Sequence, residues 1–294
     1  MKSRVLSAIS IPYTKIRSLG FRIQTDRVVQ CFLLLMLAEL LLLIAQCQAL
    51  VDDAYISARY ARNLAEGFGL VYNRAPGSER VEGYSNFLWV LLLALGIKIG
   101  FSAKFIAQFY GVVFALLSLY LCYWWVRKET ENQWLGLAGI GFLATNIYFA
   151  IWQVEGLEAP LFGLVILASI YYLGQGKDRL GMVFALFAGL ARPDGVLLFL
   201  SIALIQTWQG FKKRAGLKPV IFNWLWFIVP YFIYFLWRAI YYRSFFPNTF
   251  YAKTGLGWIA IREGLIYFRD FFIQQPGVIL VLMMILYGLV RRKA

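Results

Sequence analysis

Two adjacent carboxylates, Asp52 and Asp53, are the residues of this chain best suited to catalysis. They follow directly after residues 28–50, an apolar run long enough to cross a bilayer, and acids are costly to place at a membrane edge. The chain has no histidine, so acid–base chemistry would have to come from carboxylates, lysine, tyrosine or cysteine. The pair is therefore the first candidate for a reaction centre.

The segment that follows the pair has the pattern of a short amphipathic helix. Its apolar positions recur every four residues, at Ile56, Tyr60 and Leu64, and polar positions away from them are Arg59, Arg62 and Asn63. We expect residues 53–66 to form a helix on the membrane surface, with Asp52 or Asp53 as its N-cap. The alternative is that Asp52 serves only as a cap.

The composition indicates an all-α polytopic membrane protein. Hydrophobic residues make up 61% of the 294 residues, and the mean hydropathy is +0.66, whereas soluble domains are nearer half apolar. The formal net charge of +14 comes mostly from short basic clusters at the ends of apolar segments. This is the positive-inside pattern of a membrane protein, so we expect a lipid bilayer and no nucleic acid as partner. The three cysteines lie in apolar runs and show no disulfide or zinc spacing.

The elements that position the carboxylates are apolar segments of two lengths. Segments expected to span the membrane are 28–50, 105–126, 133–151, 159–174, 219–241 and, more briefly, 277–290. Segments too short to cross comfortably are 86–99, 181–191 and 195–208. The last two flank the sequence Ala-Arg-Pro-Asp-Gly at 191–195, and we expect two short helices that meet at this polar turn.

Charge placement predicts which loops share a side. If residues 86–99 enter the membrane and return without crossing, the basic connections all lie on the cytoplasmic side. The external loops are then 51–85, 152–158, 191–195 and 242–275. We expect one transmembrane domain over residues 1–294 and no separate soluble domain. If residues 86–99 cross fully, the loops that follow exchange sides.

Four segments carry a resemblance to a known family. They are DDAYISARYARNLAEG (52–67) with residues 69–73 and 79–89, GLEAPLF (156–162), ARPDG (191–195) and FPNTFYAK (246–253). In this order they resemble the GT-C glycosyltransferases, whose fold is a transmembrane helical bundle with a large first external loop and short re-entrant or broken helices. The resemblance is to the bacterial branch with mycobacterial terminal arabinofuranosyltransferases, and more distantly to the lipid A aminoarabinose transferase and protein O-mannosyltransferases. Many relatives continue into further spans or an extracytoplasmic domain, so acceptor recognition by such a domain is not carried over.

The resemblance implies a hexosyl- or pentosyltransferase. Its sugar would pass from a polyprenyl-phosphate donor to a glycan, glycolipid or protein acceptor of the cell envelope, at the external face of the bacterial inner membrane. A carboxylate would take the proton of the acceptor hydroxyl, and cations or a metal would stabilise the departing phosphate. A divalent metal, Mg or Mn, is compatible with this scheme.

The resemblance also assigns roles to particular residues. Asp52 is the candidate base, Asp53 is its neighbour, and Glu158 is the second acid; these three would hold the metal if one is used. Arg192 is the expected partner of the donor phosphate, because a guanidinium offers two parallel donors. The alternatives are that Glu158 is only an acid at a helix start and that Arg192 only pairs with Asp194.

Other candidates follow from the same segments. Lys253 is a second expected phosphate ligand, although it could instead extend to the lipid headgroups. Residues expected around the substrate cavity are Arg59, Glu82, Tyr84, Glu155 and Asn248. We expect Asp52, Glu158 and Arg192 to converge on one external cavity.

Two other functions stay open at this point. A lipid-linked sugar flippase or transporter would also use broken helices and intramembrane charges. Such a protein should show inverted halves, but no second Asp-Asp loop is found. A non-catalytic subunit of a glycosyltransferase complex is the other alternative, and the retained acids count against it.

Overall fold

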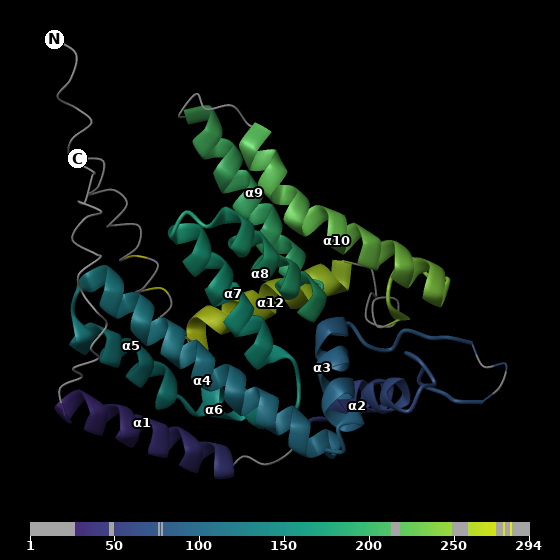
Figure 1. Cartoon of the computed structure of the whole chain (residues 1–294), viewed down its shortest axis with the longest axis horizontal. Helices are drawn as coiled ribbons and strands as arrows, with labels where there is room; N and C mark the ends of the chain where they lie inside the picture. The colour runs from purple at the N-terminus through teal and green to yellow at the C-terminus, as the bar shows by residue number, and fades with distance from the viewer. Residues whose placement is uncertain are drawn as a thin grey trace.

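The computed structural model describes residues 27–46, 50–75, 77, 79–212, 218–248, 258–274, 279 and 283 (Figure 1). All regular secondary structure in these residues is helical, which confirms the expected all-α membrane class. The helices are α1 (Arg27–Gln46), α2 (Asp52–Ala65), α3 (Phe87–Lys98), α4 (Ala103–Thr130), α5 (Gln133–Ala144), α6 (Ile147–Val154), α7 (Ala159–Gly174), α8 (Asp178–Ala191), α9 (Gly195–Lys212), α10 (Lys218–Tyr242) and α12 (Trp258–Gln274).

Within the described residues, two helices are long and apolar enough to cross a membrane. They are Ala103–Thr130, in α4, and Val220–Tyr242, in α10. The segments of α1, α3, α7 and α9 are shorter apolar helices. The predicted span at 277–290 lies outside the described residues, apart from positions 279 and 283.

One predicted span is a bent pair of helices. Residues 133–151 were expected to span the membrane, and α5 and α6, which meet at 64°, are together long and apolar enough to form a broken span or a re-entrant loop. The break lies at Asn146, whose side-chain oxygen accepts hydrogen bonds from the backbone amides of Tyr148 and Phe149 at 2.9 and 3.2 Å. This side chain starts a new helix, because it satisfies amides that an unbroken helix would have bonded internally.

The expected pair of short helices around the 191–195 turn is confirmed. Helix α8 ends at Ala191 and α9 begins at Gly195, with Pro193 between them. A Cβ on Gly195 would lie 2.3 Å from the backbone of Ala188, so only glycine allows the chain to fold back this tightly. The turn is thereby held close to the end of α8.

Helices α4 and α10 run between the same two ends of the molecule (Figure 1). At the end of α10, the hydroxyl of Tyr242 donates to the carbonyl of Leu70, in the loop after α2, at 2.9 Å. Near the start of α10, Asn223 donates to Asp178, the first residue of α8, at 3.2 Å. We call these the α2 end and the α7–α8 end.

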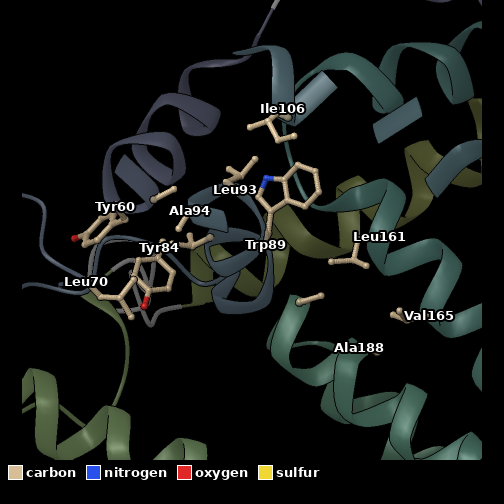
Figure 2. Packing of buried hydrophobic residues seen from close by; sticks show 14 of the residues in the cluster. Tyr60, Leu70, Tyr84, Trp89, Leu93, Ala94, Ile106, Leu161, Val165 and Ala188 are labelled. Carbon is tan, nitrogen blue, oxygen red and sulfur yellow. The ribbon is translucent and has the colours of Figure 1, made fainter. Parts of the chain in front are cut away.

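The main core lies where α2 and α3 meet α4, α7 and α8 (Figure 2). Trp89 of α3 is fully buried there, and its indole Nε1 donates to the carbonyl of Gly156 at 3.0 Å. Tyr60 of α2 and Leu161 of α7 belong to the same cluster. The core therefore fixes α2, which carries the acid pair, against the membrane helices.

Two features bear on the predicted topology. Helix α3 has 12 residues, about 18 Å at 1.5 Å per residue, and so is shorter than a bilayer core of about 30 Å. This length agrees with a segment that enters without crossing. The stretch 242–275, expected as a loop, contains the 17-residue helix α12.

Much of α10 is open along its length. Its apolar window is 6% buried, compared with 22% for α4. Large apolar side chains exposed along its middle are Ile228, Val229, Phe232, Ile233, Leu236 and Ile240. Contacts with the described helices are made by another face of α10, for example by Phe227, which stacks on Phe199 of α9 with ring centroids 4.1 Å apart.

Candidate functional site

The acid pair begins helix α2 but does not cap it, which corrects the expected N-cap. The N-cap is Val51, in an extended conformation, and no side chain makes a cap hydrogen bond. Asp52 and Asp53 already belong to the first turn and are exposed. The amide of Val51 donates to the carbonyl of Glu155 at 3.1 Å, so the start of α2 is tied to the loop before α7. The positive end of the helix dipole stabilises the charge of both carboxylates.

A cavity of about 690 Å³ runs along one side of α2. Its α2 residues recur at helical spacing: Asp52, Tyr55, Ile56, Ala58, Arg59, Arg62 and Asn63. Tyr72 and Arg74, from the loop after α2, close part of it, and residues 102–104 at the start of α4 line it too. Asp52 and Arg59, two predicted site residues, thus share one cavity.

The cavity is strongly basic. One carboxylate, Asp52, lines it together with four cations, Arg59, Arg62, Arg74 and Lys104. Within the described part of the chain, Arg62 and Lys104 have no carboxylate within ion-pair distance. Unpaired cations in a concave site raise the local concentration of anions. The cavity is therefore suited to an anionic group such as a phosphate.

Arg59 and Arg74 are held more firmly. Nε of Arg59 donates to the carbonyl of Tyr72 at 2.9 Å, and its guanidinium lies over the same tyrosine ring, 4.9 Å from the centroid. Nη2 of Arg74 pairs with Glu66 at 2.6 Å. Both guanidinium groups are thus directed by the protein, whereas Arg62 and Lys104 are left for a ligand.

Asn63 was expected on the polar side of α2, but it is 1% exposed. Its Nδ2 donates to the carbonyls of Val71 and Tyr72, at 2.6 and 3.1 Å, and its Oδ1 accepts from Nε of Arg74 at 2.7 Å. These bonds hold the following loop against α2. Asn63 therefore places Tyr72 and Arg74 at the cavity.

A second polar group is centred on Glu158. This buried acid occupies the N-cap position of α7 without capping it. Its Oε2 accepts from Nδ2 of Asn86 at 2.7 Å, and its Oε1 accepts from Nη1 of Arg192 at 2.9 Å. Asn86 also bonds Ser57 of α2, at 3.0 Å. One carboxylate therefore joins α2, α3, α7 and the α8–α9 turn.

Arg192 makes the pair with Asp194 that was considered as an alternative, its Nε donating at 3.0 Å, and its Nη1 also donates to Glu158. Neither Glu158 nor Arg192 lines the cavity of Asp52. Asp53 is four residues before Ser57 and so shares that side of α2, whereas Asp52 lies on the cavity side.

Three residues expected at the cavity lie instead near α10, and two of them, Glu82 and Tyr84, are buried. Glu82 pairs with Arg238 of α10 at 2.7 Å, and both side chains are almost fully buried. The amide of Asn248 donates to the carbonyl of Glu82 at 2.9 Å, and the hydroxyls of Tyr84 and Tyr242 lie 3.1 Å apart. These contacts fasten the first loop and residues 243–248 to α10.

Arg238 was missed from the sequence, although a lone charge in an apolar span is a signal for a buried pair. It also donates to the carbonyl of Phe245 at 2.8 Å. Burial raises the pKa of Glu82 to about 7, and the guanidinium of Arg238 keeps it from rising further. Of the other predicted residues, Glu155 contributes its carbonyl to Val51, and Lys253 lies outside the described residues.

The described residues do not fit a divalent metal. No three acidic, cysteine or histidine side chains among them come together as ligands. Of the three acids suggested for a metal, Glu158 has both oxygens engaged by Asn86 and Arg192. Asp52 lines the cavity along α2, whereas Glu158 does not, so these acids do not share one site.

Comparison with known proteins adds one relationship. No protein-family model and no solved structure matches the chain. The chain is similar to a terminal β-(1→2)-arabinofuranosyltransferase of Mycobacterium tuberculosis (strain ATCC 25618 / H37Rv), with 26% identity over 253 residues. The match covers 76% of this chain and 37% of the mycobacterial protein, so the chain spans well under half of that relative. The chain is thus an all-α membrane protein related at a distance to a glycosyltransferase.

Proposed function

We propose that this protein transfers a sugar from a polyprenyl-phosphate donor to a hydroxyl of a cell-envelope acceptor. The reaction takes place at the external face of the bacterial inner membrane. The observation that carries the proposal is the cavity along α2, where Asp52 lies among four cationic side chains. A carboxylate and a group of cations are the two components that transfer from a sugar phosphate requires.

The proposed step uses only groups of this chain. The acceptor oxygen attacks the anomeric carbon of the donor, and Asp52 accepts the hydroxyl proton. The bond between the anomeric carbon and the phosphate oxygen breaks, and its electron pair leaves with polyprenyl phosphate. The negative charge of this leaving group is stabilised by Arg59, Arg62 and Lys104.

The remaining predicted residues take supporting roles in this scheme. Asp53 is the alternative base, one residue away. Glu158 holds Arg192 and Asn86 in place, and Arg192 would have to exchange a carboxylate partner before it could bind the donor phosphate. Arg62 and Lys104 need no such exchange, and for this reason we place the phosphate beside them.

The test is a transfer assay in nanodiscs. Purified protein is supplied with polyprenyl-phosphate pentoses and hexoses and with oligosaccharide acceptors, and products are identified by mass spectrometry. We expect product from at least one donor, a higher KM for that donor in Arg62→Gln, and little change in Arg262→Gln. Arg262 is an exposed cation of α12 outside the cavity, so it controls for loss of charge alone. Absence of product from every donor, with folded protein, would contradict the proposal.

A further inference from the structure

A second basic hollow lies at the α7–α8 end of the molecule. It has a volume of about 350 Å³ and lies between the start of α8 and α10. Its lining residues are Gly176, Lys177, Asp178, Arg179, Leu180 and Asn223. We call this hollow the α8 notch. None of its residues lines the cavity of Asp52.

The α8 notch and the Asp52 cavity lie at opposite ends of α4. Lys104 of α4 lines the Asp52 cavity, whereas Lys128 of α4 bonds the side chain of Gln175, next to the notch. Along a helix, these two lysines are about 36 Å apart at 1.5 Å per residue. A bilayer core is about 30 Å thick. The notch therefore lies at the membrane face opposite that of the proposed reaction.

The charges of the notch favour a phosphate. Within the described part of the chain, Lys177 and Arg179 have no carboxylate within ion-pair distance. The one acid of the lining, Asp178, accepts a hydrogen bond from Asn223 at 3.2 Å. The first turn of α8 has no side-chain cap, so its first amides are available to an anion. Two cations beside free amides form a suitable phosphate ligand set.

The surroundings of the notch favour a lipid over a free ion. Leu180 is 43% exposed, and Phe222, Leu225 and Trp226 form an exposed apolar stripe on the neighbouring turns of α10. The guanidinium of Arg179 lies over the ring of Phe222, 5.8 Å from its centroid. The cationic site thus continues directly into an apolar surface. A molecule with a phosphate at one end and hydrocarbon at the other matches both parts.

We propose that the α8 notch binds the headgroup phosphate of an anionic phospholipid, whose acyl chains lie along this stripe of α10. The positive-inside expectation places this lipid in the cytoplasmic leaflet. The proposal is independent of sugar transfer, since it uses no residue of the Asp52 cavity. Each cation near a membrane surface strengthens anionic lipid binding by a few-fold.

The test measures lipid binding to the full chain in detergent by native mass spectrometry and thermal shift. Phosphatidylglycerol should bind and raise Tm, and phosphatidylcholine should do so much less. The double variant Lys177→Gln/Arg179→Gln should bind phosphatidylglycerol on the order of 30-fold more weakly. Arg127→Gln removes a cation from the same end but outside the notch, and its binding should match the wild type.

Two further measurements test the proposal, one on an Asp178 variant and one with inorganic phosphate. Asp178→Asn removes the one acid yet can still accept the bond from Asn223, so it should bind phosphatidylglycerol more tightly; unchanged binding would overturn the proposal even if the double variant does not fold. Inorganic phosphate should neither raise Tm as phosphatidylglycerol does nor displace it at millimolar concentration. Equal effects of inorganic phosphate, or equal binding of phosphatidylcholine, would likewise overturn the lipid assignment.

Discussion

Oε1 of Glu158 accepts a hydrogen bond from Nη1 of Arg192 at 2.9 Å, and this contact fastens the loop before α7 to the turn between α8 and α9. The other oxygen, Oε2, is held by Asn86 at 2.7 Å. Glu158 also does not line the cavity of Asp52. Glu158 is therefore better suited to position its neighbours than to act as a base.

We expect Glu158→Gln to lower the free energy of unfolding by about 1–3 kcal/mol, the usual cost of losing charged hydrogen bonds in a buried site. The glutamine amide would turn a donor toward either Arg192 or Asn86, both of which already donate. Thermal denaturation in one detergent measures the effect. Asp194→Asn is the matched control: Asp194 is exposed, and exposed ion pairs contribute about 0–1 kcal/mol. Equal losses in the two variants would show that Glu158 has no special structural role.

Asp52→Asn should separate activity from stability. The proposed base would be lost, so the transfer rate should fall by about 10²–10⁴. Asp52 makes no cap bond, so the variant should lose only its favourable interaction with the helix dipole, about 0.3–1 kcal/mol. The nanodisc transfer assay and thermal denaturation measure the two effects.

Asp53→Asn is the control for that prediction, because it removes the same charge from the other side of α2. Its transfer rate should fall less than that of Asp52→Asn. If Asp53→Asn were inactive while Asp52→Asn retained its rate, the base would move by one residue. Full activity in both variants would rule out the proposed mechanism.

The buried Glu82 should make stability depend on pH in a defined window. Its pKa rises from 4.5 in the exposed state to about 7 in the fold, so the folded protein holds this proton more tightly. The stabilisation that comes from the bound proton is complete below about pH 4.5 and is lost as the pH rises to about 7. As the pH rises across this interval, we expect the Tm of the wild type to fall relative to that of Glu82→Gln. A constant difference from pH 4.5 to 7.5 would contradict the raised pKa.

The close approach of α4 to α6 gives a prediction about packing. A Cβ on Gly111 would lie 1.8 Å from the carbonyl oxygen of Gln153, so the two helices would have to move apart. Gly111→Ala should therefore destabilise the fold by about 1–3 kcal/mol, as overpacking does. Gly163→Ala in α7 has open space around its Cβ and should be neutral or slightly stabilising. Equal Tm values for the two variants would show that α4 and α6 are packed less closely at Gly111 than in this structure.

Local sequence signals predicted some elements well. The four-residue spacing of Ile56, Tyr60 and Leu64 gave helix α2 to within a residue or two, and the Pro193 turn separated α8 from α9. In both cases the signal and the structure depend on residues only a few positions apart. Such short-range patterns are what periodicity and helix-breaking residues report.

Features that depend on distant partners were not predictable in the same way. Arg238 finds Glu82 across 156 residues, and Glu158 finds Asn86 across 72. Asn63 looked like a polar surface residue because its partners lie in a loop with no regular pattern. Of the cations of the Asp52 cavity, Arg59 was predicted, but Lys104 was not, since it comes from the start of a different helix.

The exposed face of α10 has a practical consequence for experiments on this protein. One face of α10 packs on other described helices, for example through Phe227, whereas Phe232 and Ile240 on the exposed face depend on whatever amphiphile surrounds the helix. A short-chain detergent would cover this surface loosely and leave α10 free to tilt. Because Arg238 pairs with Glu82, near the end of the first loop, such a tilt would also move this loop and disturb the approach to Asp52. Comparisons of variants should therefore hold the amphiphile fixed, and kinetic constants measured in micelles and in bilayers should not be mixed.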